Sequence, residues 1–161
     1  VKGEGYSDHQ WGNLNLPQTI EYWYWGRIHL PNLTLAYFDG EHAEKFGHQR
    51  FKHMWVIKGE KVIDYLHDGI YMEASDIVLD PFTRITYPRK LVQTIDSSRI
   101  RGTVTHRMKH FVVPLRPTGV SPVGRPMSYY AWVCDCDAKL EVDGEKVEAT
   151  RQNIHERVVY W

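Results

Sequence analysis

The chain is a succession of short runs rich in Val, Ile, Thr, Tyr and Trp, separated by Gly, Pro, Asp and Asn. β-branched and aromatic residues favour strands, and the separating residue types favour turns. Apolar positions at helical spacing are nearly absent, so the pattern predicts an all-β protein. The runs expected to form strands are 21–29, 33–39, 52–58, 61–66, 70–72, 77–79, 84–87, 91–95, 99–115, a strand pair within 129–142, 145–148 and 155–161.

The sequence also predicts the type of connection between several of these runs. Gly59-Glu60 predicts a hairpin turn, and Asp39-Gly40 and Asp143-Gly144 are turn signals as well. The polar segment 41–49 is typical of a loop or a single helical turn. The segment 116–127 holds three prolines and two glycines, and we interpret it as an exposed loop within one domain because the runs beside it are too strand-like to stand alone.

Eight to ten short strands at about ten-residue spacing indicate a sandwich or an antiparallel barrel within a single domain, residues 1–161. The aromatic content favours the barrel. Six Trp, ten Tyr and five Phe make up 13% of the residues, and so many rings suit a barrel whose interior surrounds a pocket. Strand order alone does not show closure, so the sandwich remains the alternative.

Charge, hydrophobicity and cysteine content limit the partners and the cellular location that we expect. Twenty basic and twenty acidic residues give a net charge of zero, which argues against nucleic acid as a partner because such binding needs a basic face. No apolar run is long enough to predict a transmembrane helix. Cys134 and Cys136 lie two apart on one expected strand and therefore share a face, a poor geometry for a disulfide. Unpaired thiols favour a reducing compartment, with a cytoplasmic or membrane-peripheral location.

The densest group of chemically capable residues is the run GEGYSDHQWGN at 3–13. One interpretation is a structured turn in which Asp8 accepts backbone hydrogen bonds and His9 caps a strand. The other is that Asp8 orients His9 and sets its tautomer, which would make His9 an acid or base at the mouth of a pocket. Local chemistry alone leaves both interpretations open.

This run resembles the signature of the AttH and carotenoid 1,2-hydratase (hydroxyneurosporene synthase) family of lipocalin-like proteins, Gly-x-Gly-Tyr-x-Asp-His-x-Trp-Gly. The aromatic segment 23–27 (WYWGR) and the closing Ile154-His155-Glu156 are similar to later parts of that family. Ser7 stands where many members carry a second His, which weakens a two-His mechanism. Members usually have two lipocalin-like halves and this chain resembles the second, so a missing N-terminal half, a one-domain relative or a homo-oligomer are the expected alternatives.

The resemblance implies acid-catalysed hydration of an isolated alkene by acidic and aromatic groups. The positions that match by motif are His9, Trp11, Tyr37 and Asp39. Tyr37 and Asp39 are two apart on one strand and face the same side. A carboxyl group in a ring-lined pocket has a raised pKa and stays protonated as an acid, and ring faces stabilise a cation. The catalytic residues that we predict are Asp39, His9, Tyr37 and Asp8, and the predicted substrate contacts are Trp11, Trp23, Trp25 and Arg27.

Each assignment has a structural alternative. Asp39 before Gly40 is equally typical of a turn, and Trp23 and Trp25, like Trp55, suit simple barrel filling. Arg27 suits either a buried partner of Asp8 or Asp39, or the surface. We expect no metal, because no zinc motif is present despite nine His. A serine hydrolase is unexpected as well, because no nucleophile elbow occurs.

Three functions follow. The first is a lipocalin-like enzyme without a cofactor that hydrates, cyclises or isomerises an apolar prenyl, terpenoid or polyketide-type substrate. The second is a protein of the same fold that binds an apolar small molecule and does no chemistry. The third is a structural half that supports a missing partner half. The first, with hydration as its favoured reaction, is the function that we predict, and the other two are its alternatives.

Overall fold

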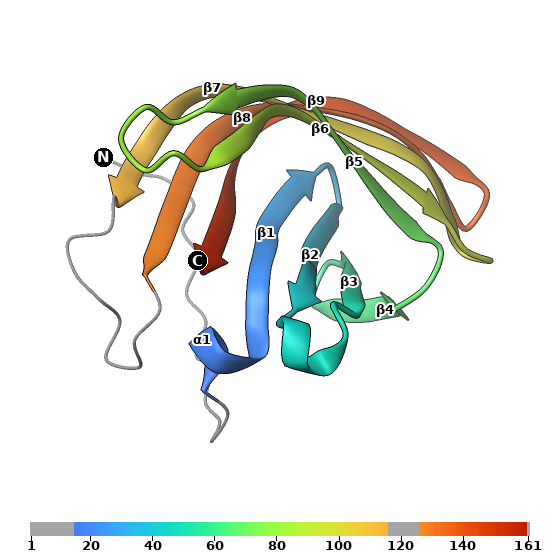
Figure 1. Ribbon diagram of the computed structural model, residues 1–161. Coiled ribbons are helices and arrows are strands. Elements are labelled where there is room, and N and C mark those ends of the chain that lie inside the picture. The colour runs from blue at the N-terminus through green and yellow to red at the C-terminus, as the bar shows by residue number, and fades with distance from the viewer. Residues whose placement is uncertain (1–14, 116–125, 161) are drawn as a thin grey trace.

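The computed structural model describes residues 15–115 and 126–160, which form one curled antiparallel sheet (Figure 1). A short helix, α1 (Leu16–Thr19), precedes the first strand, and a 3-10 turn, η1 (Glu44–Phe46), follows the second. The strands are β1 (Ile20–Leu30), β2 (Leu33–His42), β3 (Arg50–Lys58), β4 (Lys61–Leu66), β5 (Ile70–Leu79), β6 (Thr86–Asp96), β7 (Ile100–Leu115), β8 (Met127–Val142) and β9 (Glu145–Tyr160).

The sheet confirms the all-β antiparallel prediction. Its strand order is β4-β3-β2-β1-β9-β8-β7-β6-β5, so the first and last strands pair at its centre and all other neighbours are consecutive in sequence. The sheet curls until its edge strands β4 and β5 face one another (Figure 1), but these two strands are not paired. Across this seam the Lys52 ammonium donates to the Ile70 carbonyl (2.7 Å). The described part of the chain is therefore a half-barrel with a bridged seam.

Several of the predicted strands were too short. The runs at 70–72 and 77–79 belong to one strand, β5, and those at 145–148 and 155–161 belong to β9, described as far as Tyr160. The region 129–142, expected to hold a strand pair, is the single strand β8. Polar residues interrupt the apolar pattern without ending the strand, because their outward side chains stay in solvent while the backbone ladder continues.

The Asp39-Gly40 turn was also a wrong prediction. β2 runs through both residues to His42, and Gly40 pairs with Trp23 on one side and with Phe51 on the other. Backbone hydrogen bonds to two neighbouring strands outweigh the local turn preference of an Asp-Gly pair. By contrast, the turns predicted at Gly59-Glu60 and Asp143-Gly144 are confirmed.

The core lies on the inner face of the curl, as alternation along β2 shows. Leu35, Tyr37 and Asp39 are 0%, 1% and 2% exposed, whereas Ala36 and Phe38 between them are half-buried. A strand places successive side chains on opposite faces, so β2 turns one residue in two toward the interior. The two cysteines are free and buried on the inner face of β8, which confirms that they share a face.

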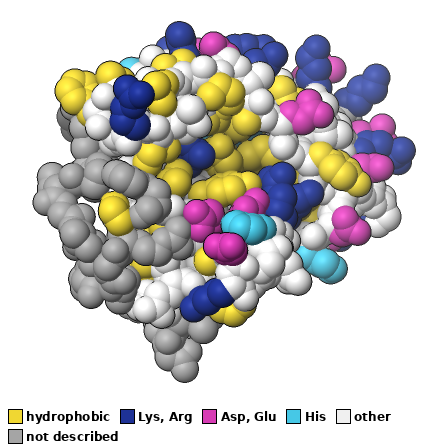
Figure 2. All heavy atoms as spheres, in the orientation of Figure 1, with side chains coloured by type: hydrophobic (Ala, Val, Ile, Leu, Met, Phe, Trp, Pro, Cys, Tyr) yellow, Lys and Arg dark blue, Asp and Glu magenta, His cyan; other side chains and the backbone are white. Residues whose placement is uncertain are grey.

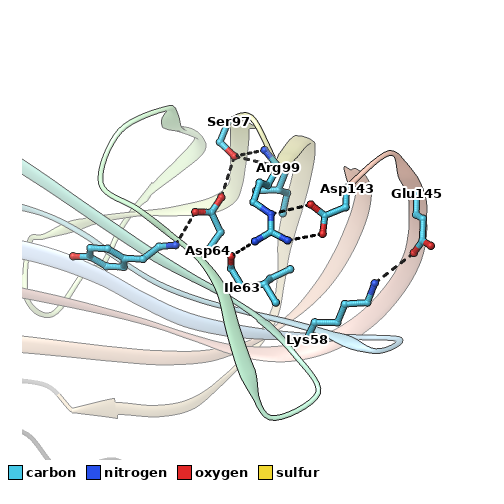
Figure 3. Close-up of polar contacts among 9 residues, drawn as sticks. Lys58, Ile63, Asp64, Ser97, Arg99, Asp143 and Glu145 are labelled. Atoms are coloured by element: carbon cyan, nitrogen blue, oxygen red, sulfur yellow. Dashed lines mark hydrogen bonds and ion pairs between the residues drawn. The ribbon is translucent and has the colours of Figure 1, made fainter.

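One end of the half-barrel, here called the turn end, collects the β1–β2, β3–β4, β6–β7 and β8–β9 turns. Arg99, in the β6–β7 turn, joins the β8–β9 turn to strand β4 (Figure 3). Its guanidinium donates to both carboxylate oxygens of Asp143 (2.9 and 2.8 Å) and to the Ile63 carbonyl. Ser97 Oγ donates to Asp64 (3.3 Å) and accepts from the Arg99 amide (3.3 Å). This network ties β4 to the opposite flank of the sheet.

The opposite end, here called the loop end, carries the β2–β3 and β5–β6 connections. Figure 2 shows a hollow on the face of the molecule in view, with hydrophobic side chains inside it and basic and acidic side chains at its margin. No helix in the described ranges is long and apolar enough to cross a membrane.

Candidate functional site

Two rows of inward side chains cross the middle of the sheet toward the loop end. In the first row, strand pairing places Tyr37 of β2 opposite Gly26 of β1, and Gly26 opposite His155 of β9. In the second row, two residues along each strand, Asp39 lies opposite Tyr24, and Tyr24 lies opposite Arg157. The two rows share one face because alternate residues of a strand do.

Gly26 allows Tyr37 and His155, on either side of it in the first row, to contact each other. A Cβ atom at position 26 would lie 2.4 Å from the Tyr37 hydroxyl and 2.6 Å from ring atom Cζ. Without that atom, the Tyr37 ring lies across β1, and its hydroxyl is hydrogen-bonded to His155 Nδ1 on the next strand. Tyr37 and His155 are each 1% exposed, so the pair has little room to rearrange.

The Tyr37–His155 pair is neutral and presents one free nitrogen. Burial, with the charges of His106 and Arg157, holds the pKa of His155 well below its usual range, and burial raises the pKa of Tyr37 well above its own. If Tyr37 donates, His155 Nε2 carries the imidazole hydrogen; if Nδ1 donates, Nε2 is a bare acceptor. Nε2 is buried and has no hydrogen-bond partner in the structure. The shared proton can therefore lie on either Tyr37 or His155 while the pair stays neutral.

A second buried imidazole lies beside the first. The ring centroids of His106 and His155 are 5.6 Å apart. His106 Nε2 lies 3.0 Å from Gln93 Oε1, and His106 Nδ1 lies 3.2 Å from Cys136 Sγ, so the neutral tautomer donates to the amide and accepts from the thiol. Burial lowers the pKa of His106 to about 4 and raises that of Cys136 to about 12. A thiol of such high pKa is not a nucleophile at neutral pH.

Asp39 is the acidic group of the site. Its Oδ1 accepts a hydrogen bond from Arg50 Nη2 (2.6 Å), and its Oδ2 is buried without a partner. Burial raises the pKa of Asp39, and this effect exceeds the opposing effect of the Arg50 guanidinium. Arg50 is itself nearly half exposed, so solvent screens its charge. Asp39 therefore holds its proton to a higher pH than an ordinary carboxyl group.

Aromatic side chains form the walls. The Trp132 ring lies 4.9 Å from that of His155, and the Tyr24 ring 5.6 Å from it, between centroids. Tyr130, beside Trp132 on the same face of β8, hydrogen-bonds Thr83 (2.7 Å) and Asp80 (3.2 Å) of the β5–β6 connection. These bonds hold that connection against the site at the loop end.

The structure brings together only part of the predicted set. Tyr37 and Asp39 lie two apart on the inner face, as their spacing predicts. Trp23, Trp25 and Arg27 alternate with the inward residues of β1 and lie on the other face, where Trp23 packs against Phe38 and Tyr160. Trp55 also points away from the inner residues Met54 and Val56. His9, Asp8 and Trp11 lie outside the described residues.

The sequence analysis missed most of the partners of Tyr37 and Asp39. It gave His155 only as part of a family-like segment, and it assigned no role to Gly26. The missed residues are Tyr24, Gly26, Arg50, Gln93, His106, Trp132, His155 and Arg157. Alternation along a strand gives each residue's face, but only the pairing of β1 with β9 places residue 155 beside residue 26. In the described ranges, no three His, Cys, Asp or Glu residues are grouped so that they could hold a metal ion.

The fold has solved relatives. CghA aligns with a TM-score of 0.63 at 12% identity, over 91% of this chain and 42% of that one. Kievitone hydratase from Nectria haematococca aligns with a TM-score of 0.55 at 14% identity, over 88% and 40% of the two chains. An AttH-like protein from Nitrosomonas europaea aligns with a TM-score of 0.51 at 14% identity, over 91% and 55%.

These identities are low enough that the likeness shows the fold alone, and that fold is the AttH-like, lipocalin-like one that the sequence resemblance implies. This chain spans between 40% and 55% of the length of these three proteins. The sequence matches no protein-family model and no curated protein.

Proposed function

We propose that this chain is a lipocalin-like enzyme without a cofactor that acts on an apolar prenyl, terpenoid or polyketide-type substrate. The proposed reaction is acid-catalysed hydration of a C=C bond, or a cyclisation or isomerisation through a similar cation. The observation that carries the proposal is Asp39, a buried carboxyl group with a raised pKa and one oxygen without a partner. A carboxyl group of this kind is suited to act as a general acid.

The surroundings of Asp39 support this role. Arg50 occupies Oδ1 and leaves Oδ2 to carry the proton. Tyr24, opposite Asp39 on the next strand, and Trp132 present rings beside His155, and ring faces stabilise a cation. His155 is neutral and adds a group that can take up a proton. Among the proteins that share the fold, kievitone hydratase is by name a hydratase.

The reaction balances with these groups. Asp39 gives the proton on Oδ2 to one alkene carbon, which leaves a cation on the other carbon and a carboxylate on Asp39. Water adds to the cation and gives up its extra proton to neutral His155. Transfer of that proton from His155 to Asp39 through solvent restores both groups, and the net change is one water molecule added across the double bond. Asp8 and His9 remain predicted catalytic residues, and Trp11 remains a predicted substrate contact.

Labelled water tests the proposal. Geraniol, geranic acid and a prenylated phenol are incubated with the protein in H2¹⁸O, and mass spectrometry of the products is expected to show one incorporated ¹⁸O. Asp39→Asn is expected to lower the rate about 100-fold or more, the usual loss when a general acid is removed. Asp135→Asn is the matched control, because Asp135 is partly exposed on the outer face of β8 and pairs with Lys109 (3.4 Å); its rate should stay near wild type.

Two results would contradict the enzymatic role. One is the absence of any hydrated, cyclised or isomerised product from the whole panel, which would favour a binding protein of the same fold. The other is an Asp39→Asn variant that turns over as fast as the wild type.

A further inference from the structure

Arg157 is the basic side chain at the centre of the site. It lies on the inner face of β9, opposite Tyr24 on one side and Tyr130 on the other. Its guanidinium carbon is 5.4 Å from the centroid of the Tyr24 ring and 5.9 Å from that of Tyr22. Its Nη1 donates to the Thr86 carbonyl at the start of β6. The guanidinium is thus fixed between two aromatic rings and the opposite flank of the sheet.

No carboxylate in residues 15–115 or 126–160 forms an ion pair with Arg157. Its Nε is buried and has no acceptor. Asp39, in the same row, is separated from it by Tyr24 and is paired with Arg50 instead. The other paired arginines reach their carboxylates at the surface, as Arg99 does with Asp143. A partly buried cation without a counter-charge is costly unless an anion reaches it.

Other buried polar atoms of the inner face are also hydrogen-bond donors without acceptors. The amide nitrogens of Gln93 and Asn153 are buried donors without partners, and Asp39 Oδ2 is also a donor when it carries the proton. Buried polar groups in folded proteins are normally hydrogen-bonded. An occupant that satisfies this site must therefore bring oxygen acceptors as well as apolar surface.

We propose that the site binds an anionic ligand, a carboxylate or acidic enol on an otherwise apolar prenyl or polyketide-type skeleton, with the anion held by Arg157. The guanidinium presents Nε–H and its remaining N–H groups to two oxygens at once, a geometry that suits a carboxylate. Tyr22 and Tyr24 shield the ion pair from water, which strengthens it. This inference takes the site from the proposed function and names the class of its substrate, but binding tests it without turnover.

Calorimetric titration with two probes that share one tail gives the test. Geranic acid and geraniol differ at the head group, and at pH 7.5 the acid is ionised. We expect the wild type to bind geranic acid about tenfold or more tightly than geraniol, because a hydrogen bond to a charged group contributes more than one to a neutral group. In Arg157→Met the acid is expected to lose this advantage, while the affinity for geraniol changes less than threefold.

The control variant is Arg151→Met. Arg151 lies on the same strand and is exposed, and its guanidinium donates to the Thr150 carbonyl (3.0 Å), so this change should keep the preference for the acid. Circular dichroism and thermal unfolding verify that each variant is folded. Arg157→Gln, which is polar but uncharged, replaces Arg157→Met if the latter does not fold.

Equal affinities for acid and alcohol in the wild type, no saturable binding of the acid below about 1 mM, or an undiminished preference in the folded Arg157 variant would each overturn the inference. Its failure is distinct from failure of the proposed function. A preference for the acid without any hydrated, cyclised or isomerised product supports the anion site and contradicts the proposed reaction. Incorporation of ¹⁸O without a preference for the acid does the reverse.

Discussion

Polar groups at the surface of the turn end have hydrogen-bond partners, whereas several polar groups on the inner face have none. At the turn end, Arg99 and Ser97 find partners in Asp143 and Asp64 near the surface. On the inner face, by contrast, several buried polar atoms of the described residues lack partners: Asp39 Oδ2, Gln93 Nε2, Asn153 Nδ2, His155 Nε2 and Arg157 Nε. An unsatisfied buried polar atom costs roughly 1–3 kcal/mol. The polar groups at the surface of the turn end are therefore satisfied, and the inner face keeps polar groups ready for a ligand at a cost in stability.

The largest effect on stability is expected in the apolar core next to the turn end. Leu35 is fully buried and lies opposite Ile28 and Val56 on the neighbouring strands. Leu35→Ala leaves a cavity there, and we expect the free energy of unfolding in urea to fall by about 2–5 kcal/mol. The affinity of the folded variant for geranic acid should stay within twofold of wild type. A large loss of affinity in the folded variant would show that the two regions are not separable.

The buried imidazoles should make stability depend on pH. His106 has a folded-state pKa of about 4 against a usual value of 6.5, so between these values the unfolded chain binds more protons than the folded one. Stability is therefore lost as the pH falls from 6.5 to 4, by about 3 kcal/mol over the whole window for this group. Urea unfolding between pH 7.5 and 5 measures the slope.

His106→Gln should reduce that slope and leave the part that comes from His155, whose pKa is lowered as well. A wild-type protein whose stability is constant from pH 7.5 to 5 would mean that His106 is not held neutral by burial.

Gly26 contributes to both the site and the packing of the fold, and its substitution should lower both the turnover and the stability. Gly26→Ala brings a methyl group to 2.4 Å from the Tyr37 hydroxyl, and the buried ring must move. Overpacking of this kind costs about 1–3 kcal/mol, and we also expect the turnover to fall because Tyr37 leaves His155. Tyr37→Phe is the comparison, because it removes the hydroxyl and keeps the ring in place. If Gly26→Ala changes neither the urea midpoint nor the turnover, the two strands do not approach as closely as described.

The smallest effect is expected at the surface network of the turn end. Arg99→Met removes the bonds to Asp143 and the Ile63 carbonyl, but solvent-exposed ion pairs contribute little to stability. We expect a shift in the urea midpoint smaller than that of Gly26→Ala, and unchanged binding of geranic acid. A midpoint shift as large as that of Leu35→Ala would contradict this expectation, because it would show that the exposed network contributes as much stability as the core.

The sequence predicted the fold class, and it predicted that Tyr37 and Asp39 share one face, for reasons that are local. Alternation along β2 puts Tyr37 and Asp39 on one face, and runs of β-branched and aromatic residues mark the strands. It could not place His155, because the contact depends on β1 pairing with β9 rather than with a neighbour in sequence. Nor could it show that Asp39-Gly40 stays in a strand, since that depends on the two flanking strands. The aromatic run 23–27 drew attention to Trp23 and Trp25, whereas the glycine that follows them faces the site.

Asp39 and His155 of the inner face are held in their neutral forms and, with the Arg157 cation, are available to a ligand, and His155 reports on this most directly. Nitrogen-15 NMR of the imidazole groups at pH 7, with His155→Gln to assign the signals, distinguishes neutral from protonated rings. We predict a neutral His155 in the free protein and a change in its Nε2 signal when geranic acid saturates the site. A protonated His155 at pH 7, or an Nε2 signal unmoved at saturation, would contradict the account.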